Sequence, residues 1–460
     1  MKKTLGLFLA FLSLAACSKP TPIYYDGWIV DFKDDVSVEK IAEIEKELDI
    51  SLQPNSKIFN QNKITITKKS LTDSQIEDLR DTGLVQNVER NQIISIFPNE
   101  HIGVSNEKVA THTPIHTNLP NDPLYLDGKQ WNFDMVGMPD VWGRPEVALG
   151  TGVVVAVLDT GVSNGSHTAA RVPDMNQTCI LEGFNFVDNS TDAYDAVGHG
   201  THVSGTIAQS TNNGIGVAGL APGVCILPVK VLSDEGIGTI ADIVDGLYFA
   251  VASGATVVNL SLGSSAPSAS LKDAIEKVAQ HGVFLACAAG NDGEAHLNYP
   301  AGFEGCHAVS ALDHTRQLAW YSSFGDSVFG QKVFLSAPGG DTRESLDYGI
   351  WQDTVVDGDL TRHGYFPFQG TSMATPHVAA AAALVLSNLK PEDRSLENVE
   401  VILAKSAVDL GDEVRFGYGA LDINKALLFT TEKANKSSWW GSLVVGLLSV
   451  PVIFWIVKKK

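Results

Sequence analysis

Five continuous apolar runs constrain the fold of this chain more than any other feature of its sequence. Helical patterns such as Ala241–Ala252 and Leu271–His281 lie between the runs. Continuous apolar strands that alternate with helices indicate an α/β domain with a parallel sheet buried on both faces. Because functional sites in such sheets form at the carboxyl ends of the strands, we expect the chemistry where the runs end. The runs are residues 152–159, 223–232, 255–262, 282–290 and 306–312.

The net charge of the chain bears on whether it binds nucleic acid. The 460 residues include 33 Lys and Arg against 53 Asp and Glu, which gives a net charge of −20. Such a surface repels phosphate backbones, so we expect no nucleic-acid partner. The length allows one large domain with accessory segments.

The first 16 residues have the pattern of a secretory signal. Lys2 and Lys3 precede an apolar run, and small residues precede Cys17. This pattern predicts export from the cytoplasm. The sequence LAAC that ends at Cys17 also resembles a bacterial lipobox, in which this cysteine carries the lipid. The alternative is a conventional signal peptide cut at small residues, with Cys17 incidental.

The other end of the chain predicts a membrane segment. Residues 437–457 contain no charged side chain and are followed by Lys458, Lys459 and Lys460. That length spans a bilayer, and the positive-inside rule keeps the lysines in the cytoplasm. The alternative is a sorting segment that is cut off. Both ends therefore predict the bacterial cell envelope, with the protein anchored in the periplasm or at the outer surface, or secreted after processing.

Residues 23–97 predict a small α+β domain with the order strand, helix, strand, helix, strand. After it, residues 98–120 contain Pro98, Pro114 and Pro120 and little apolar periodicity. This composition predicts an exposed linker that proteases cut easily. The expected elements of the domain are Gly27–Lys33, Val38–Leu48, Lys63–Lys69, Asp73–Asp81 and Val85–Phe97.

Four cysteines remain once Cys17 is set aside. An even set in an exported chain favours two disulfides, and four cysteines allow three pairings. The sequence does not choose among the pairings, although Cys179 with Cys225 and Cys287 with Cys306 close the shortest loops. The alternative is four buried thiols.

Three polar residues stand where the sheet rule places a site. Asp159 ends the first apolar run, His199 opens a stretch of small residues, and Ser372 follows Gly370 at the start of an Ala-rich helix. A serine hydroxyl becomes a nucleophile when an imidazole takes its proton, and a carboxylate fixes the tautomer of that imidazole. Each residue alone could be structural, for example as a helix cap. The short spacing of His199 and His202 is also compatible with a metal site, but this segment lacks the glutamate of HExxH enzymes.

The segments around these residues resemble the three signatures of the subtilisin-like serine proteases, the subtilases. They are VAVLDTGV, GHGTHVSGTIA and GTSMATPHVAA, in the order Asp, His, Ser known for subtilisin. The resemblance also includes NLSLG, AAGN and SAPGG. It implies a three-layer subtilisin-like α/β domain with a mostly parallel central sheet at residues 121–430. It further implies that residues 23–97 are a ferredoxin-like prodomain, which inhibits the enzyme and is cut off in the linker.

The resemblance implies a serine endopeptidase that acts on polypeptides through an acyl-enzyme. Ser372 is implied as the nucleophile, His199 as the general base and then acid, and Asp159 as the carboxylate that orients the imidazole. Asn291 matches the asparagine that stabilises the oxyanion together with the Ser372 N–H. The segments implied to pair with substrate and to line the first specificity pocket are Ser261, Leu262, Gly263, Ala288, Ala289 and Gly290.

The segment STNNGIGVAG resembles the calcium loop of the family. Side-chain and carbonyl oxygens of this kind suit calcium. The aspartate that the family usually carries nine residues after the catalytic one is Thr168 in this chain. The ligands implied by the resemblance are Gln130, Thr211, Asn213, Ile215 and Val217.

Two other functions stay open at the level of sequence. One is a subtilase-fold protein that binds peptides without cutting them, although all three triad residues are present. The other is an α/β-hydrolase esterase, but GTSMA is not the GxSxG elbow and the order Asp, His, Ser differs from the hydrolase order. His202 and His377 are interpreted as packed helix residues rather than as additional bases.

Overall fold

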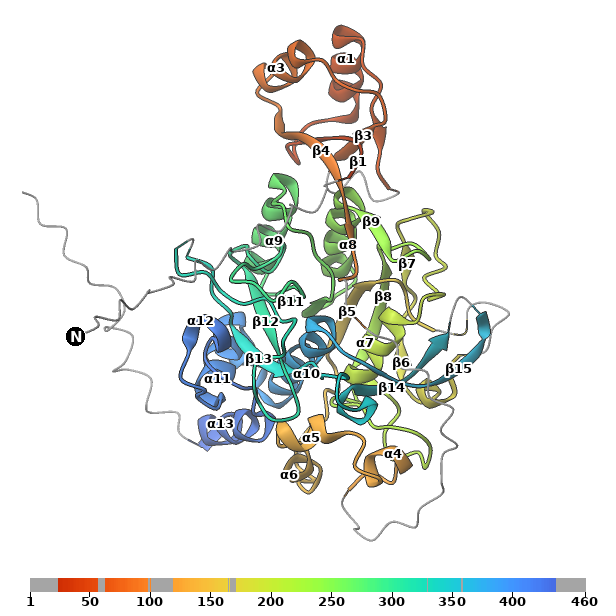
Figure 1. Ribbon diagram of the computed structural model, residues 1–460. Coiled ribbons are helices and arrows are strands. Elements are labelled where there is room, and N and C mark those ends of the chain that lie inside the picture. Colours follow the sequence, from red (N-terminus) through yellow and green to blue (C-terminus); the bar gives the residue numbers. More distant parts are fainter. Residues whose placement is uncertain are drawn as a thin grey trace, which may run out of the picture.

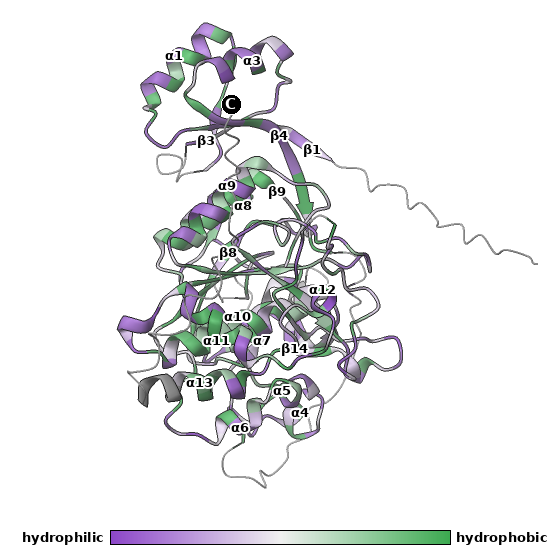
Figure 2. Ribbon diagram, turned by 90° about the vertical axis from the view of Figure 1, so that its left-hand side faces the viewer, coloured by the Kyte–Doolittle hydropathy of each residue, from purple (hydrophilic) through white to green (hydrophobic). Residues whose placement is uncertain are grey.

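The structure is a computed structural model that describes residues 24–56, 63–97, 100, 119–163, 165, 171–328, 330–356 and 359–435. A small N-terminal unit lies at one end of a large α/β domain in both views of the molecule (Figures 1 and 2). The predicted signal at 1–16, Cys17, most of the linker, Thr168 and the predicted membrane segment at 437–457 lie outside the described residues.

An eight-stranded sheet forms the centre of the large domain. Its strand order is β13-β12-β11-β10-β5-β8-β6, with β7 also on β8, and each of these pairings is parallel. The five predicted apolar runs are confirmed as β5, β8, β10, β11 and β12, whereas the short strands β6, β7 and β13 were not predicted. The bounds are β5 Val154–Asp159, β6 Cys179–Ile180, β7 Phe184–Asn185, β8 Cys225–Lys230, β10 Val257–Leu260, β11 Phe284–Ala288, β12 Cys306–Leu312 and β13 Leu335–Pro338.

Alternate residues of the central strands face two different helical layers. In β5, Val155 and Val157 belong to a core shared with α7, α10, α11 and α13, whereas Ala156 and Leu158 belong to a core shared with α8 and α9. Buried faces of this kind make a three-layer α/β fold. The helices are α7 His199–Ala208, α8 Ile240–Ala252, α9 Ala269–Gln280, α10 Thr371–Asn388, α11 Leu396–Ser406 and α13 Ile423–Asn435.

Helix α10 is buried along most of its length, from Thr371 to Leu386. Its residues 379–383 are five consecutive alanines, each at most 1% exposed. Small side chains let the helix lie close to the sheet on one side and to α7 and α13 on the other. By contrast, α9 carries hydrophilic as well as hydrophobic residues (Figure 2), as expected for a helix that covers a sheet with one face.

Short helices follow the linker and precede the final helix. Three of them, α4 to α6, lie between the linker and β5, and Tyr125, Phe133 and Trp142 pack their rings together there. The bounds are α4 Pro123–Leu126, α5 Trp131–Met135, α6 Met138–Trp142 and α12 Glu413–Phe416, with 3-10 turns at Pro173–Met175, Leu346–Tyr348 and Pro391–Asp393.

The N-terminal unit is an antiparallel sheet with two helices on one face. The predicted helices 38–48 and 73–81 are confirmed with the expected bounds. In β1, Val30 and Phe32 pack under these helices, whereas Ile29 joins the core around α8 of the large domain. Both faces of this strand are therefore buried. The bounds are β1 Tyr25–Phe32, α1 Val38–Leu48, β2 Gln53–Pro54, β3 Ile64–Thr67, α3 Asp73–Asp81 and β4 Val85–Ser95.

One sheet connects the two parts of the molecule. Its order is β2-β3-β1-β4-β9, and β9 (Ile237–Thr239) belongs to the large domain. Strand β4 reaches out of the N-terminal unit and runs beside β9 (Figure 1), with Ile93 paired to Thr239 and Ser95 to Ile237. The end of β4 is thereby carried toward the middle of the large domain.

A hairpin that was not predicted from the sequence precedes α10. It consists of β14 (Ile350–Val356) and β15 (Asp359–Phe368), and β14 lies against α7. The ring of Phe368 stacks on His202 of α7 with centroids 4.2 Å apart. The hairpin therefore supports the helix that begins at His199.

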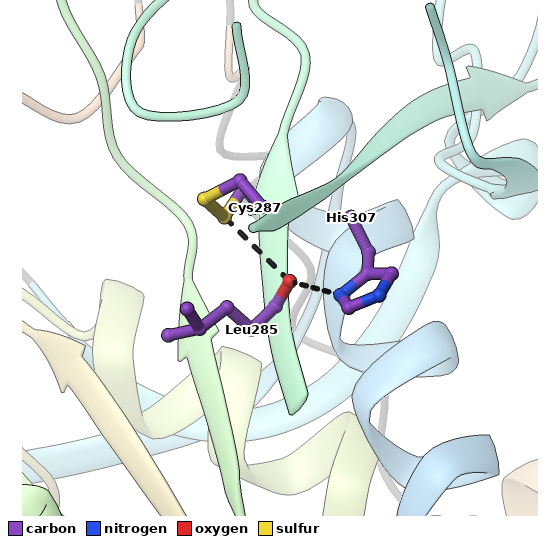
Figure 3. The surroundings of a disulfide bond; sticks show 4 residues. Leu285, Cys287 and His307 are labelled. Carbon is purple, nitrogen blue, oxygen red and sulfur yellow. Dashed lines mark hydrogen bonds between the residues drawn. A yellow bond between two sulfur atoms is a disulfide. The ribbon is translucent and has the colours of Figure 1, made fainter. Parts of the chain in front are cut away.

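Two disulfides join neighbouring strands of the central sheet. Cys179 of β6 is bonded to Cys225 of β8, and Cys287 of β11 is bonded to Cys306 of β12. Figure 3 shows that the second bond lies beside Leu285, whose carbonyl oxygen accepts a hydrogen bond from His307 Nδ1 at 3.0 Å. Among the helices that the structure describes, none has both the length and the apolar character needed to cross a bilayer.

Candidate active site

Asp159 and His199 meet at the carboxyl edge of the central sheet. Asp159 is the last residue of β5 and His199 is the first of α7, and both are buried. Asp159 Oδ1 lies 2.7 Å from His199 Nδ1 and also accepts a hydrogen bond from the Thr160 N–H at 2.7 Å. The close approach requires Gly200, because a Cβ there would lie 2.1 Å from the carbonyl oxygen of Gly161. The carboxylate of Asp159 therefore holds the Nδ1 atom of the His199 ring.

Ser372 stands at the start of α10, directly after Gly370 and Thr371. It exchanges two hydrogen bonds with Ser261, the residue that follows β10. Ser372 Oγ donates to the Ser261 carbonyl oxygen at 3.2 Å, and Ser261 Oγ donates to the Ser372 carbonyl oxygen at 2.8 Å. The nucleophile candidate is thus tied to the segment predicted to pair with substrate.

Asn291 lies in the loop after β11 with its side-chain amide in a defined orientation. Its Oδ1 accepts hydrogen bonds from the Thr371 N–H at 2.9 Å and from Thr371 Oγ1 at 2.8 Å. The amide nitrogen therefore points away from Thr371, and it donates to Glu100 Oε1 at 3.3 Å. A donor fixed in this way suits the stabilisation of an oxyanion.

The chain's own residues 95–97 lie between Gly236 and Gly263, next to these groups, in a position that we call the groove. The Gly263 N–H donates to the Ser95 carbonyl oxygen at 3.2 Å, and the Ile96 N–H donates to the Gly236 carbonyl oxygen at 3.1 Å. Phe97 is 5% exposed, and a Cβ on Gly263 would lie 2.5 Å from its ring. Antiparallel pairing of Ser95 with Gly263 places Phe97 opposite Ser261.

One of the two predicted specificity segments contacts residues 95–97. Gly263 pairs with the occupying chain, and Leu262 is fully buried beneath it. At the other segment, the Gly290 N–H donates to Thr371 Oγ1 at 3.2 Å, and Ala288 and Ala289 are buried.

Glu100 brings a second carboxylate to His199. Glu100 Oε2 lies 3.0 Å from His199 Nε2, and both side chains are almost completely buried. Burial alone would lower the pKa of His199, but the Asp159 and Glu100 carboxylates outweigh it and hold this pKa well above its ordinary value. The imidazole is therefore stabilised as a cation while Glu100 is in place.

His202 and His377 are packed in the core, in agreement with their interpretation as structural residues. His202 Nε2 donates to the Ile350 carbonyl oxygen at 2.8 Å, and burial lowers its pKa to about 3. His377 Nδ1 donates to the Met373 carbonyl oxygen at 2.8 Å, and burial lowers its pKa to about 4. Both rings are neutral at physiological pH.

Asp195 is a site residue that the sequence analysis missed. It is buried, and it accepts hydrogen bonds from Thr160 Oγ1 at 2.9 Å, the Gly198 N–H at 2.9 Å and Thr201 Oγ1 at 2.7 Å. These partners come from the end of β5 and from both sides of His199. Asp195 therefore joins the two segments that carry Asp159 and His199. An acidic residue four positions before His199 is the only signal for it in the sequence.

The predicted calcium loop lies beside two aspartates that were not predicted. Asn213 Nδ2 donates to Asp174 Oδ1 at 2.7 Å, and the Asn213 N–H donates to Asp122 Oδ1 at 3.3 Å. Asp174 also accepts from the Val217 N–H at 2.9 Å. Burial raises the pKa of Asp122 to about 6 and that of Asp174 to about 8. Asp174 follows Thr168 by six residues, so the fixed spacing used for the prediction missed it.

Gln130 does not fit the ligand role predicted for it. Its Oε1 accepts from the Ala218 N–H at 2.8 Å and its Nε2 donates to the Ala218 carbonyl oxygen at 2.9 Å, so the side-chain amide is satisfied by the backbone. Ile215 is 39% exposed and Thr211 donates its hydroxyl to the Gln209 carbonyl oxygen. Within the described residues, no group of three or more His, Cys, Asp or Glu side chains is arranged to hold a metal ion.

Comparisons with known proteins identify the family. Residues 150–419 match the model of the Subtilase family. Alkaline elastase YaB of Bacillus sp. (strain YaB) is 38% identical over 298 residues, which are 64% of this chain and 69% of the relative. Subtilisin BL of Lederbergia lenta is 38% identical over 298 residues, 64% of this chain and 97% of the relative. The thermophilic serine proteinase of Bacillus sp. (strain AK1) is 31% identical over 407 residues, 87% of each chain.

A solved structure supports the same conclusion. A protease from Pseudoalteromonas arctica matches with a TM-score of 0.59 and 31% identity, over 68% of this chain and 99% of that one. The fold is the expected mostly parallel α/β fold, and the matched region contains Asp159, His199 and Ser372. The chain belongs to the subtilase family and is a subtilisin-like serine endopeptidase.

Proposed function

We propose that this chain is an exported endopeptidase that hydrolyses proteins through Asp159, His199 and Ser372, and that it is made as a self-processing zymogen. The observation that carries the proposal is the 2.7 Å contact between Asp159 and His199 at the mouth of a groove that already holds an extended peptide segment. Members of the family hydrolyse peptide bonds, and the arrangement of this chain supports the same chemistry.

The reaction begins with attack of Ser372 Oγ on the substrate carbonyl carbon. His199 Nε2 takes the hydroxyl proton, and Asp159 stabilises the imidazolium that forms. The Asn291 amide nitrogen and the Ser372 N–H stabilise the negative charge on the carbonyl oxygen. His199 then gives its proton to the leaving amine. Water hydrolyses the acyl-enzyme on Ser372 by the same steps.

Substrate binding follows from the contacts of residues 95–97. An extended peptide takes the place of these residues and adds a strand between Gly263 and β9. Main-chain pairing of this kind accepts many sequences, and the pockets for alternate side chains supply the preference. We propose a preference for a large apolar residue at the position of Phe97, on the amino side of the cut.

We propose that residues 23–97 act as the intramolecular inhibitor. Support comes from three attachments to the large domain besides the groove. Glu89 Oε1 accepts from Ser268 Oγ at 2.8 Å at the start of α9, Asn91 Oδ1 accepts from the Ala241 N–H at 3.2 Å in α8, and Asn55 Nδ2 donates to Asp245 at 2.8 Å. Cutting the linker between residues 98 and 120 would let this unit leave.

We propose a structural calcium site at Asp122, Asp174 and Asn213. The two buried carboxylates match the oxygen ligands that calcium prefers, and a cation would offset the cost of burying their charge. Asn213 would join them once its amide oxygen, which accepts from the Ile215 N–H at 3.0 Å, turned toward the ion. Thr211, Ile215 and Val217, whose carbonyl oxygens are the other implied ligands, belong to the same loop. The ion would stabilise the folded loop and takes no part in the chemistry at Ser372.

The location is proposed from the sequence. The signal at 1–16 supports export, the lipobox supports a lipid on Cys17, and residues 437–457 support a second attachment. Cutting the linker would separate the protease from the lipid, and the C-terminal segment would then retain it. Labelled fatty acid should therefore appear on the N-terminal fragment and disappear in Cys17→Ala. Lipid on a chain that begins beyond Glu100 would contradict this arrangement.

The function is tested by comparing the exported protein with a Ser372→Ala variant. We expect the wild type to be cut between residues 98 and 120 and to react with a fluorophosphonate, whereas Ser372→Ala stays full length and unlabelled. Ser387→Ala is the matched control, because it removes a serine from the same helix about four turns away and should behave as wild type. If the control and Ser372→Ala are cut and labelled alike, Ser372 is not the nucleophile.

A further inference from the structure

Glu100 makes contacts that a peptide passing through the groove as substrate has no need to make. Its side chain is 6% exposed, Oε2 lies 3.0 Å from His199 Nε2, and Oε1 accepts from Asn291 Nδ2 at 3.3 Å. A Cβ on Gly370 would lie 2.9 Å from Glu100 Oε1, so the carboxylate also sits against the start of α10. One carboxyl group therefore contacts two groups that the proposed reaction uses.

These contacts block two separate steps of the reaction. His199 must accept a proton from Ser372 at Nε2, but an imidazolium held between Asp159 and Glu100 has no free lone pair there. The Asn291 amide nitrogen must donate to the oxyanion, but it already donates to Glu100. Ser372 Oγ meanwhile donates to the Ser261 carbonyl oxygen. The site is thus assembled but unable to begin catalysis.

Glu100 lies in the linker, a few residues after the segment that pairs with Gly263. Phe97 lies opposite Ser261, and Glu100 follows it by three residues, within the stretch of linker that we expect to be cut. Pro98 follows Phe97 directly, so the peptide bond after Phe97 has no N–H. Residues 95–97 therefore occupy the groove while Glu100 contacts His199 and Asn291.

We propose that Glu100 is an autoinhibitory latch, whose carboxylate pairs with His199 and Asn291 in the uncut chain and delays the first cleavage. The inference rests on the proposed function, because it assigns a regulator to the same site. Release of the latch needs only that the Glu100 side chain withdraw, which frees Nε2 and the Asn291 amide together. No residue of the mature catalytic machinery changes.

The first test measures how fast the purified full-length chain cuts its own linker. Glu100→Gln keeps the shape and removes the charge, and Glu100→Ala removes both contacts. Because a charge-assisted buried contact is lost, we expect both variants to self-process about tenfold faster or more than wild type. Glu107→Gln is the matched control, a glutamate of the same linker, and should process at the wild-type rate. After processing, all four proteins should have equal kcat/KM on a peptide substrate.

The second test reads the protonation of His199 without any cleavage. In a Ser372→Ala background with 15N-labelled histidine, the ring nitrogens report the charge of each imidazole. The charged or titratable groups acting on His199 are Asp159 from β5, Glu100 from the linker and His202 on its own helix. We expect His199 to remain protonated to a higher pH with Glu100 than with Glu100→Gln, while His202 and His377 stay neutral in both.

The two proposals fail in different ways. If Glu100→Gln and Glu100→Ala self-process at or below the wild-type rate, or if the titration of His199 is the same with Gln at this position, the latch is wrong while the protease function stands. If neither wild type nor any variant is ever cut or labelled by a fluorophosphonate, the proposed function fails, and the latch fails with it.

Discussion

Thr371 fixes the orientation of Asn291 through two hydrogen bonds to the same oxygen, from its N–H at 2.9 Å and from its hydroxyl at 2.8 Å. The amide nitrogen of Asn291 therefore points away from Thr371, toward the position of Glu100, where the oxyanion would form.

Replacing Asn291 should therefore reduce catalysis with little change in binding. We expect Asn291→Leu to lower kcat by about 10²–10³-fold with a similar KM, the size of loss known for the corresponding donor of subtilisin. Thr371→Val should give a smaller loss in the same direction, because the amide keeps its backbone partner. Steady-state kinetics on a processed enzyme measure both, and an unchanged kcat in Asn291→Leu would remove this residue from the mechanism.

Gly200→Ala should separate Asp159 from His199. The added Cβ would lie 2.1 Å from the Gly161 carbonyl oxygen, so α7 must move away from β5. A displacement of this kind can cost about 100-fold in rate. The control is Gly205→Ala in the same helix, where the nearest atom is the end of the Gln209 side chain. Alanine favours a helix at both positions, so loss of kcat in Gly200→Ala alone identifies the steric contact.

Calcium should stabilise the folded chain through Asp174. In a Ser372→Ala background, we expect calcium to raise Tm by several degrees relative to a chelator, since a ligand at about 100 times its Kd adds about 2.7 kcal/mol. Asp174→Asn should lose most of this increase, and the exposed Asp188→Asn should keep it. A calcium response that is the same in all three proteins would place the ion elsewhere.

The two disulfides should contribute unequally to stability. The bond between Cys179 and Cys225 spans 46 residues of sequence and that between Cys287 and Cys306 spans 19. The loop-entropy model then gives about 4 kcal/mol for the first bond and about 3 kcal/mol for the second. Denaturant unfolding of the two double Cys→Ser variants, again with Ser372→Ala, should show the larger loss for the first pair. The reverse order would mean that packing around the bonds dominates.

Asp31 should make the N-terminal unit less stable as the pH rises. Burial raises its pKa to about 7 from 3.8, although Asn87 Nδ2 donates to it at 3.2 Å. Because the folded state binds this proton more tightly than the unfolded state, the stability falls between about pH 4 and pH 7 and stays low above that range. The loss amounts to at most a few kcal/mol, at about 1.4 kcal/mol for each pKa unit.

Asp31→Asn removes this dependence. With Ser372→Ala to prevent cutting, we expect a higher Tm than the parent at pH 8 and an equal Tm at pH 4. Asp35→Asn, which replaces an exposed neighbour, should follow the parent at both values. A variant that is less stable than the parent at pH 8 would show that the Asp31 carboxylate is favourable as a charge.

The sequence predicted the central sheet because its strands are continuous apolar runs, and it predicted Asp159 because this residue ends the first run. His199 and Ser372 were predicted at the starts of helical stretches, and the resemblance of their segments to the subtilase signatures implied their roles. The hairpin was missed for the opposite reason. In its first strand, three consecutive polar residues are completely buried: Gln352, Asp353 and Thr354. The strand therefore lacks the alternation of buried apolar and exposed polar residues that marks a strand in a sequence. No periodic pattern marks a strand whose polar side chains face inward.

The remaining omissions concern residues that come together from distant parts of the chain. Asp174 lies at the predicted calcium loop and Asp195 lies beside the segment of His199. No fixed spacing along the sequence marks either aspartate. Glu100 lies in a proline-containing stretch that reads as an exposed linker, yet its side chain is buried at His199. Only folding of β4 alongside β9 brings that stretch to the centre of the molecule.

When the N-terminal unit departs, the sheet loses β4, and the backbone of β9 is left as an unpaired edge. Strand β9 and Gly263 then lose the backbone partner that they had during folding, and their free N–H and C=O groups become a template for another chain. Any polypeptide that is locally extended can complete it, including an unfolded copy of the enzyme itself. The freed enzyme is therefore expected to bind unfolded polypeptides of many sequences. Because unfolded copies of the enzyme are among them, its lifetime in solution should shorten as its concentration rises.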